Sequence, residues 1–315
     1  MGAKEADMGT IKTLNELKDK TKQERKQMIA IANAADTGIL QAVKMALEDG
    51  LCRFKLFGDK NKMEKDAAEL GFVMDQWPSE ELIIEHTEQI DEAAVAAVRS
   101  VSSKEADILM KGDIATKNIL KAALNKEYGL RTGKILSHVA LFEIPNQERL
   151  IFLTDAAMNI APDLQQKAEI INNAVQIAQG IGVEVPKVAA ITPVEVVNQA
   201  MPSTIDAAVL TQMQRRNQIK GCIIDGPLAF DNAVSITAAN QKGIDSEVAG
   251  HADILLASSI EAGNALYKSF VYYAQAKVAA VISGAKVPII LTSRADTAEN
   301  KLYSISLALV SSKSF

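Results

Sequence analysis

The stretch that decides the fold is MIAIANAADTGILQAVKMALEDGLCRFKLF, residues 28–57. It opens with an apolar run of strand type at 28–32, continues with a helical repeat of apolar residues at 37–49 that stops before Gly50, and ends with a second strand-like run at 53–57. A helix between two short apolar strands is the pattern of a crossover unit, in which the two strands are parallel. This stretch therefore predicts a parallel sheet with helices on its faces.

The same alternation of short apolar runs and longer helical segments continues to the end of the chain. Repeated crossover units build a layered sheet, so the predicted fold class is α/β. No linker rich in Pro, Gly or Ser marks a domain boundary. The further predicted strands are 107–110, 150–155, 187–191, 222–225, 253–256 and 287–291, and the further predicted helices are 92–101, 116–124, 163–179, 205–217 and most of 260–281.

Composition limits the possible partners. A chain of 315 residues that is 48% hydrophobic exceeds the size at which one core usually keeps growing, so we expect two domains. The net charge of −5 provides no basic field for nucleic acid. The two cysteines, Cys52 and Cys222, lie far apart with no CxxC spacing and no histidine cluster. We therefore expect neither a nucleic-acid partner nor a metal site.

The sequence carries no signal for export or membrane insertion. Residues 1–7 are charged and lack the apolar core of a signal peptide. The longest apolar region, 278–291, is interrupted by Lys286 and is shorter than the ~20 residues that a membrane span needs. We therefore expect a cytoplasmic protein with no membrane partner.

Polar residues follow several of the predicted strands. They occur at 111–113, 154–155, 225–231 and 292–296. In open α/β sheets ligands bind at the carboxyl ends of the strands. Each polar residue could also be only a cap for the next helix, but their number indicates a site.

The segment after the last predicted strand favours an anion. Ser293 and Asp296 fit a variant of the capping box, which would be a purely structural role. Arg294 between them would oppose the helix dipole by ~0.3–1 kcal/mol unless an anion is bound there. An ion pair of Arg294 with Asp296 or Glu299 is the structural alternative. A hydroxyl, a helix N-terminus and a guanidinium together suit a phosphate or an oxyanion.

Other candidates have plain structural alternatives. Asp225 and Asp231 fit turn chemistry, Asn264 fits a helix cap, and Lys111 fits either a phosphate contact or a solvated lysine. No GxxxxGK[ST], GxGxxG or GxSxG motif is present. The residues alone predict an α/β enzyme that handles anions.

Five segments together resemble the phosphate acetyl/butyryltransferase family, and the resemblance is collinear over residues 25–312. They are LSHVALFE at 136–143, TDAAMNIAPD at 154–163, DGPLAFDNA at 225–233, EAGNALYK at 261–268 and TSRAD at 292–296.

The resemblance implies two three-layer α/β/α domains with a cleft between them, as in isocitrate and isopropylmalate dehydrogenases. The first domain would comprise 1–140 and 286–315, and the second, 141–285, would be inserted in it. The resemblance also implies a homodimer or larger homo-oligomer, with no metal and no prosthetic group.

The reaction implied by the resemblance is the reversible conversion of butanoyl-CoA and phosphate to butanoyl phosphate and CoA. It would proceed in a ternary complex without an acyl-enzyme, and CoA would be a substrate rather than a cofactor. Ser293 and Arg294 would stabilise the oxyanion and the phosphate. The acetyl branch has its base aspartate seven residues after that serine, where this chain has Asn300, so Glu299 is the predicted base and Asp296 the substitute. The matching segments assign substrate, phosphate or CoA contacts to Ser137, Asp155, Asn159, Asp225, Asp231, Asn264 and Asp296, and Lys111, outside these segments, is a further candidate for the phosphate.

Three rival functions remain open from the sequence. The first is phosphate acetyl transfer; Lys111-Gly112, where the acetyl branch begins the ligand loop with serine-glycine, favours the butyryl branch and a larger acyl pocket. The second is a decarboxylating dehydrogenase, which would need a cluster of metal-binding aspartates. The third is a non-catalytic sensor of CoA or an acyl phosphate.

Overall fold

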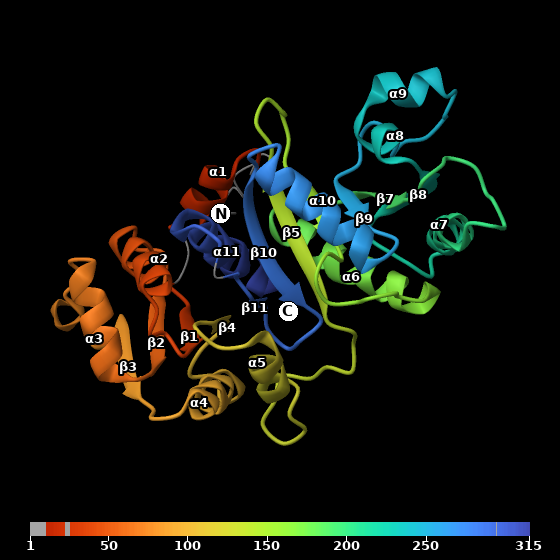
Figure 1. The fold of residues 1–315 in the computed structure, drawn as a ribbon. Helices are drawn as coiled ribbons and strands as arrows, with labels where there is room; N and C mark the ends of the chain where they lie inside the picture. Colours follow the sequence, from red (N-terminus) through yellow and green to blue (C-terminus); the bar gives the residue numbers. More distant parts are fainter. Residues whose placement is uncertain (1–10, 23–25, 294) are drawn as a thin grey trace, which may run out of the picture.

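The computed structural model describes residues 11–22, 26–293 and 295–315. The described residues form one 11-stranded sheet in the order β3-β2-β1-β4-β11-β10-β5-β6-β9-β7-β8 (Figure 1). The strands are β1 (Met28–Ala32), β2 (Arg53–Gly58), β3 (Leu82–His86), β4 (Ile108–Lys111), β5 (Ser137–Glu143), β6 (Ile151–Thr154), β7 (Lys187–Ile191), β8 (Ile223–Leu228), β9 (Ile254–Leu256), β10 (Lys277–Ser283) and β11 (Ile289–Ile290).

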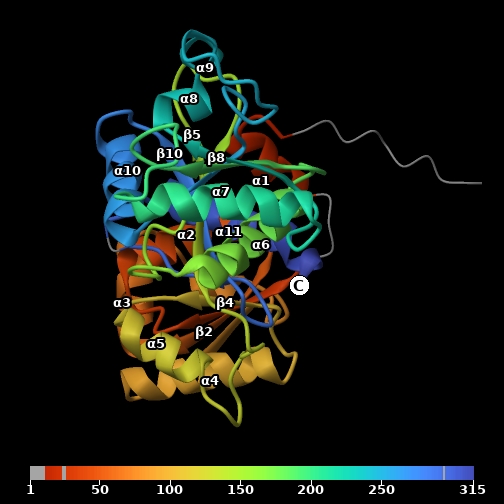
Figure 2. The ribbon, with the colours of Figure 1, turned by 90° about the vertical axis from the view of Figure 1, so that its right-hand side faces the viewer.

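Helices cover both faces of this sheet, because α2, α6 and α11 pack against one set of alternate β1 residues and α4 and α5 against the other. Figure 2 shows α7 and α6 in its upper half and α5 and α4 in its lower half. None of the described helices is both long enough and apolar enough to cross a bilayer. The helices are α1 (Leu14–Thr21), α2 (Thr37–Glu48), α3 (Lys60–Glu69), α4 (Ile90–Ser102), α5 (Thr116–Ala123), α6 (Leu164–Gly180), α7 (Pro202–Arg215), α8 (Phe230–Val234), α9 (Ile236–Gln241), α10 (Ile260–Tyr272) and α11 (Ala298–Ser311), with 3₁₀ turns at Met74–Gln76 and Ser312–Ser314.

The predicted α/β class is confirmed, and the strand directions add what the sequence did not predict. The strands β3, β2, β1, β4 and β11 are parallel to one another, and so are β6, β9, β7 and β8. Between these sets, β10 and β5 are antiparallel to each other and to their outer neighbours. The second set therefore runs opposite to the first. The proposed boundaries at 140/141 and 285/286 stay a prediction.

One helix prediction is wrong. The segment 260–281 was expected to be mostly helical, but α10 ends at Tyr272 and β10 begins at Lys277. The two alanines Ala279 and Ala280 favour a helix by intrinsic propensity. Tertiary context overrides this preference, because β10 is buried in the middle of the sheet beside β5.

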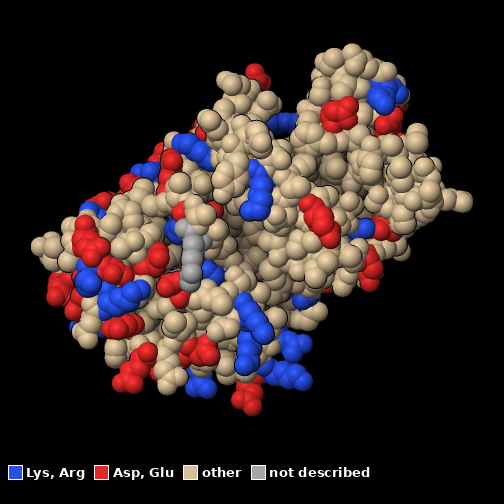
Figure 3. Space-filling view, viewed as in Figure 1, with Lys and Arg blue, Asp and Glu red and all other residues tan. Residues whose placement is uncertain are grey.

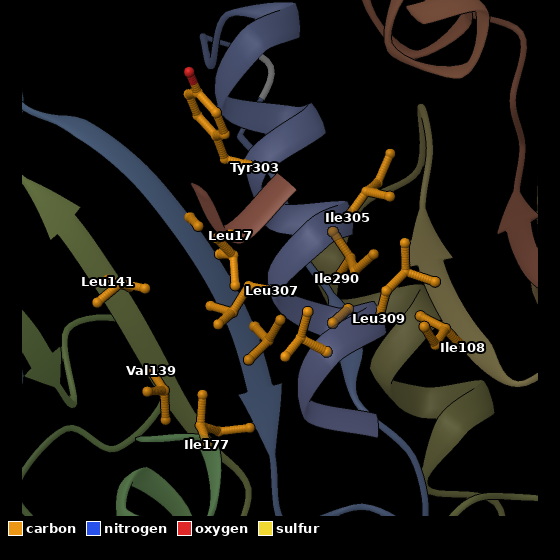
Figure 4. Packing of buried hydrophobic residues seen from close by; sticks show 14 of the residues in the cluster. Leu17, Ile108, Val139, Leu141, Ile177, Ile290, Tyr303, Ile305, Leu307 and Leu309 are labelled. Carbon is orange, nitrogen blue, oxygen red and sulfur yellow. The ribbon is translucent and has the colours of Figure 1, made fainter. Parts of the chain in front are cut away.

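The helix α11 is the central packing element. Its residues 301–311 are all buried, and they contact α1, α2, α6 and β10. Figure 4 shows Leu307 and Leu309 of α11 between Leu141 of β5 and Ile108 of β4. Burial of these side chains, each contributing roughly 1.5–3 kcal/mol, fixes α11 against both parts of the sheet.

The sheet opens between β10 and β11. All of β10 pairs with β5, but β10 pairs with β11 only at Ile282 and Ile289. Buried backbone N–H groups need partners. Here α11 supplies them: the Val278 N–H donates to Asn300 Oδ1 at 3.2 Å, and the Ala280 N–H donates to Ser304 Oγ at 3.0 Å. Side chains of α11 thus replace a neighbouring strand where the sheet divides.

Candidate functional site

A cavity of about 640 Å³ lies where the sheet opens. Its walls come from the end of β4, the start of α5, the loop after β6, α10, β10, the segment after β11 and the first turns of α11. Figure 3 shows a hollow in the middle of this face of the molecule, with Lys and Arg side chains near its rim. Segments distant in sequence therefore meet at one site.

The end of β4 contributes a buried cation. Lys111 is the last residue of β4, lines the cavity and is only 7% exposed. Its Nζ lies 3.3 Å from the Gly112 carbonyl oxygen. A Cβ on Gly112 would lie 2.0 Å from the Asn33 carbonyl oxygen, so only glycine fits between these two loops. The structure therefore places Lys111 where it can contact an anion in the cavity.

The segment after β11 forms a tight turn at the cavity mouth. The Ser293 N–H donates to Asp296 Oδ2 at 2.7 Å, and Ser293 Oγ accepts from the Ala295 N–H at 3.2 Å. Ser293 and Asp296 both line the cavity. The capping variant expected for these residues does not start the helix: α11 begins at Ala298 and is capped by Thr297. Ser293 and Asp296 instead shape a turn that faces the cavity.

Arg294, on which the anion argument from sequence depends, lies outside the described residues. Its assignment as a donor stays a prediction.

The loop after β6 forms the opposite wall. Asp155 is 3% exposed, and its Oδ1 accepts from the N–H groups of Ala157 and Met158 at 2.8 and 2.9 Å. Its Oδ2 accepts from Asn159 Nδ2 at 2.6 Å. Asn264 on α10 donates to the Ala156 carbonyl oxygen at 3.1 Å and lines the cavity. Asp155 and Asn159 thus hold the loop that lines the wall, and their predicted ligand contacts stay predictions.

His138 lines the cavity, although it was given no role from sequence. It is 7% exposed, and its buried Nδ1 has no partner among the described residues. Burial lowers the pKa of His138, against the opposing effect of the Asp155 and Asp296 carboxylates. Its ring lies 5.8 Å from that of Tyr267, whose pKa is raised by burial. Nothing in the sequence marks His138, because its position on the cavity side of β5 follows only from the pairing of β5 with β10.

Part of the cavity lining is apolar. Val278, Ala280 and Ile282 of β10 contribute this part, which we call the floor of the cavity. Asn300 and Ser304 of α11 also line it, and their oxygens accept the β10 N–H groups described above. The charged side chains lining the cavity among described residues are Lys111, Lys268 and Asp296. The cavity therefore combines cationic and polar lining groups with apolar ones.

Glu299, the predicted base, is not at the cavity. Its Oε1 accepts from the Tyr303 hydroxyl at 2.7 Å and from Lys277 Nζ at 3.1 Å. These two contacts hold the pKa of Glu299 below its usual value. Residues four apart share one face of a helix, so Glu299 and Tyr303 face Lys277, while Asn300 and Ser304 face the cavity.

Three other predicted contacts are not brought to the cavity. Ser137 is fully buried, and its Oγ accepts from Asn173 Nδ2 at 2.9 Å. Asp225 Oδ1 accepts from the Gly226 N–H at 2.9 Å within β8, and Asp231 lies exposed in the first turn of α8. The prediction assumed that all strand ends meet at one edge. The strands β9 and β7 separate the edge strand β8 from β6, whose following loop lines the cavity, so the end of β8 lies away from it.

Within the described ranges no group of three or more His, Cys, Asp or Glu side chains could hold a metal ion.

Residues 79–309 match the family model described as phosphate acetyl/butaryl transferase. The chain is 51% identical over 302 residues to a probable phosphate butyryltransferase of Bacillus subtilis (strain 168), covering 96% of this chain and 99% of that protein. It is 46% identical over 282 residues to a phosphate acetyltransferase of Thermotoga maritima, covering 90% and 94%. A branched-chain phosphotransacylase from Enterococcus faecalis V583 has a similar crystal structure, with a TM-score of 0.79, 35% identity and coverage of 91% and 99%.

Proposed function

The chain belongs to the phosphate acetyl/butaryl transferase family, and from this premise we propose that it converts butanoyl-CoA and phosphate reversibly to butanoyl phosphate and CoA. The observation that carries the proposal is that cationic, polar and apolar side chains line one cavity. Lys111, Ser293 and Asp296 line it together with the apolar β10 side chains of its floor. A phosphate and a short hydrocarbon chain need these two environments side by side.

The transfer needs a proton acceptor and donors for developing charge. In the direction of butanoyl-CoA synthesis, a carboxylate takes the thiol proton of CoA, the thiolate attacks the carbonyl carbon of butanoyl phosphate, and the carbon–oxygen bond to phosphate breaks. Of the two carboxylates considered for this step, Asp296 lines the cavity and Glu299 does not. We therefore assign the base to Asp296.

Lys111 and Ser293 are donors of the described cavity wall, which also holds Asp296. An ammonium group and a hydroxyl stabilise negative charge on the carbonyl oxygen and on the leaving phosphate. The family resemblance assigns the same stabilising role to Arg294. Direct transfer between two bound substrates requires no acyl-enzyme.

Acetyl transfer is the second candidate, because the Thermotoga relative named phosphate acetyltransferase is 46% identical. The apolar floor formed by Val278, Ala280 and Ile282 favours the longer acyl group. The proposal also includes a cytoplasmic homo-oligomer that uses CoA as a substrate and needs no metal or prosthetic group, as the resemblance implies.

The proposal is tested by following thiol release from butanoyl-CoA on addition of phosphate. Wild type should release CoA only with phosphate and form one equivalent of butanoyl phosphate. Asp296→Asn and Arg294→Ala should each lower turnover by ~10²–10³-fold, and Lys117→Ala, an exposed lysine outside the cavity wall, serves as control. No phosphate-dependent release by wild type would leave only a sensor function and would refute the proposal.

A further inference from the structure

The floor of the cavity has a pattern of side-chain size. Alternate residues of β10 face the cavity, and each lies opposite one residue of β5. The three cross-strand pairs are Val278–Phe142, Ala280–Ala140 and Ile282–His138. Directly opposite residues are neighbours on one face of a sheet. The middle pair therefore consists of two small side chains, and the pairs on either side of it contain large ones. The cavity floor is deepest at this middle pair.

Tyr267 of α10 closes this depression on the β5 side. Its ring lies 5.8 Å from that of His138 and 5.3 Å from that of Phe142. These two residues are ~13 Å apart along the strand at ~3.3 Å per residue, so the Tyr267 ring lies over the intervening Ala140. Of the two alanines in this pair, Ala280 lines the cavity and Ala140 does not.

The two α11 side-chain oxygens beside β10 already accept hydrogen bonds within the protein. Ser304 Oγ accepts from the Ala280 N–H and donates to the Asn300 carbonyl oxygen at 2.9 Å. Asn300 Oδ1 accepts from the Val278 N–H. A polar ligand group in the depression would find these acceptors occupied, whereas a hydrocarbon leaves no polar group unsatisfied.

We infer that the depression over Ala280 holds the acyl tail of the substrate and that the size of residue 280 sets the longest tail accepted. This inference rests on the proposed function, since it concerns the same cavity. The tail lies between Val278 and Ile282 with its carbonyl toward the polar lining groups. An acetyl group is too short to fill the depression, so its transfer does not depend on residue 280.

A larger side chain at residue 280 should therefore act against long acyl groups selectively. In Ala280→Leu the ratio of kcat/KM for butanoyl-CoA to that for acetyl-CoA should fall by at least ~10-fold, since one methylene in an apolar pocket is worth ~10–200-fold. Ala280→Val should give a smaller fall. The matched control is Ala265→Leu, an exposed position of α10 outside the cavity wall, which should keep the wild-type ratio.

Several outcomes would overturn the inference. An unchanged ratio in a folded Ala280→Leu, or an equal loss with both thioesters, would show that residue 280 does not contact the tail. If circular dichroism shows that the residue 280 variants do not fold, Val278→Ala decides instead. This variant should raise the ratio of kcat/KM for pentanoyl-CoA to that for butanoyl-CoA. An unchanged ratio refutes the inference. Inactivity of wild type with every acyl-CoA would refute the proposed function, which separates the two failures.

Discussion

Asn300 accepts a hydrogen bond from the Val278 backbone N–H through its side-chain Oδ1, at 3.2 Å. The bond joins α11 to the edge of β10 at the point where β11 has already ended. It gives a partner to a backbone N–H group of β10 that a neighbouring strand would otherwise bind. One side chain thus connects the opening of the sheet to the wall of the cavity.

Removal of this acceptor should destabilise the protein. Asn300→Leu leaves the Val278 N–H without its partner, at a cost of about 1–3 kcal/mol in the free energy of unfolding. Asn300→Asp keeps an oxygen in the same position and should cost less. Urea denaturation of both variants at pH 7 measures the difference; equal stability of the Leu variant and wild type would contradict the role of this bond.

Glu299 should be dispensable for catalysis. Its carboxylate contacts Tyr303 and Lys277 rather than the cavity, so Glu299→Gln should keep turnover within about twofold of wild type. Asp296→Asn, which changes a carboxylate of the cavity wall, should lose at least ~10²-fold. Initial rates with butanoyl-CoA and phosphate compare the two. A large loss for Glu299→Gln alone would return the base to Glu299.

The contacts of Glu299 should instead make the free energy of unfolding depend on pH. Because Tyr303 and Lys277 lower its pKa in the folded protein, Glu299 stabilises the fold above its unfolded pKa of about 4.3 and loses this contribution as pH falls through the lower folded value. The stability difference between wild type and Glu299→Gln should therefore be largest near pH 7 and shrink as the solution is acidified.

Urea midpoints at a series of pH values measure this trend. Tyr303→Phe, which removes the larger cause of the shift while keeping the ring, should weaken the pH dependence. A difference between wild type and Glu299→Gln that is constant with pH would contradict the assigned contacts.

Much of the fold was predictable because each strand and helix leaves a local pattern. The run at 28–32 and the helix that ends before Gly50 appear where the apolar spacing placed them. The direction of β5 and β10 leaves no such pattern, since it depends on which strands become neighbours. The place of β8 at the edge of the sheet leaves no such pattern either, so the positions of Asp225 and Asp231 relative to the cavity could not be predicted, and their assigned contacts stay predictions.

The residue at which α11 begins could not be predicted from the sequence either. The sequence indicated a capping turn at Ser293, whereas the helix is capped by Thr297. Neighbouring residues of a helix point about 100° apart around its axis, so Asn300 faces the cavity and Glu299 does not. His138 was missed for a related reason: its position on the cavity side of β5 follows only once β5 is known to pair with β10.

The close approach at Gly112 has a consequence for the cation beside it. A hydrogen atom is all that the Asn33 carbonyl leaves room for, so the two loops are fixed by steric crowding, which has no dependence on salt or acidity. Any bulkier residue would push the loops apart and move the neighbouring ammonium group of Lys111, which lines the cavity. The position of this group therefore depends on the lack of a side chain at residue 112.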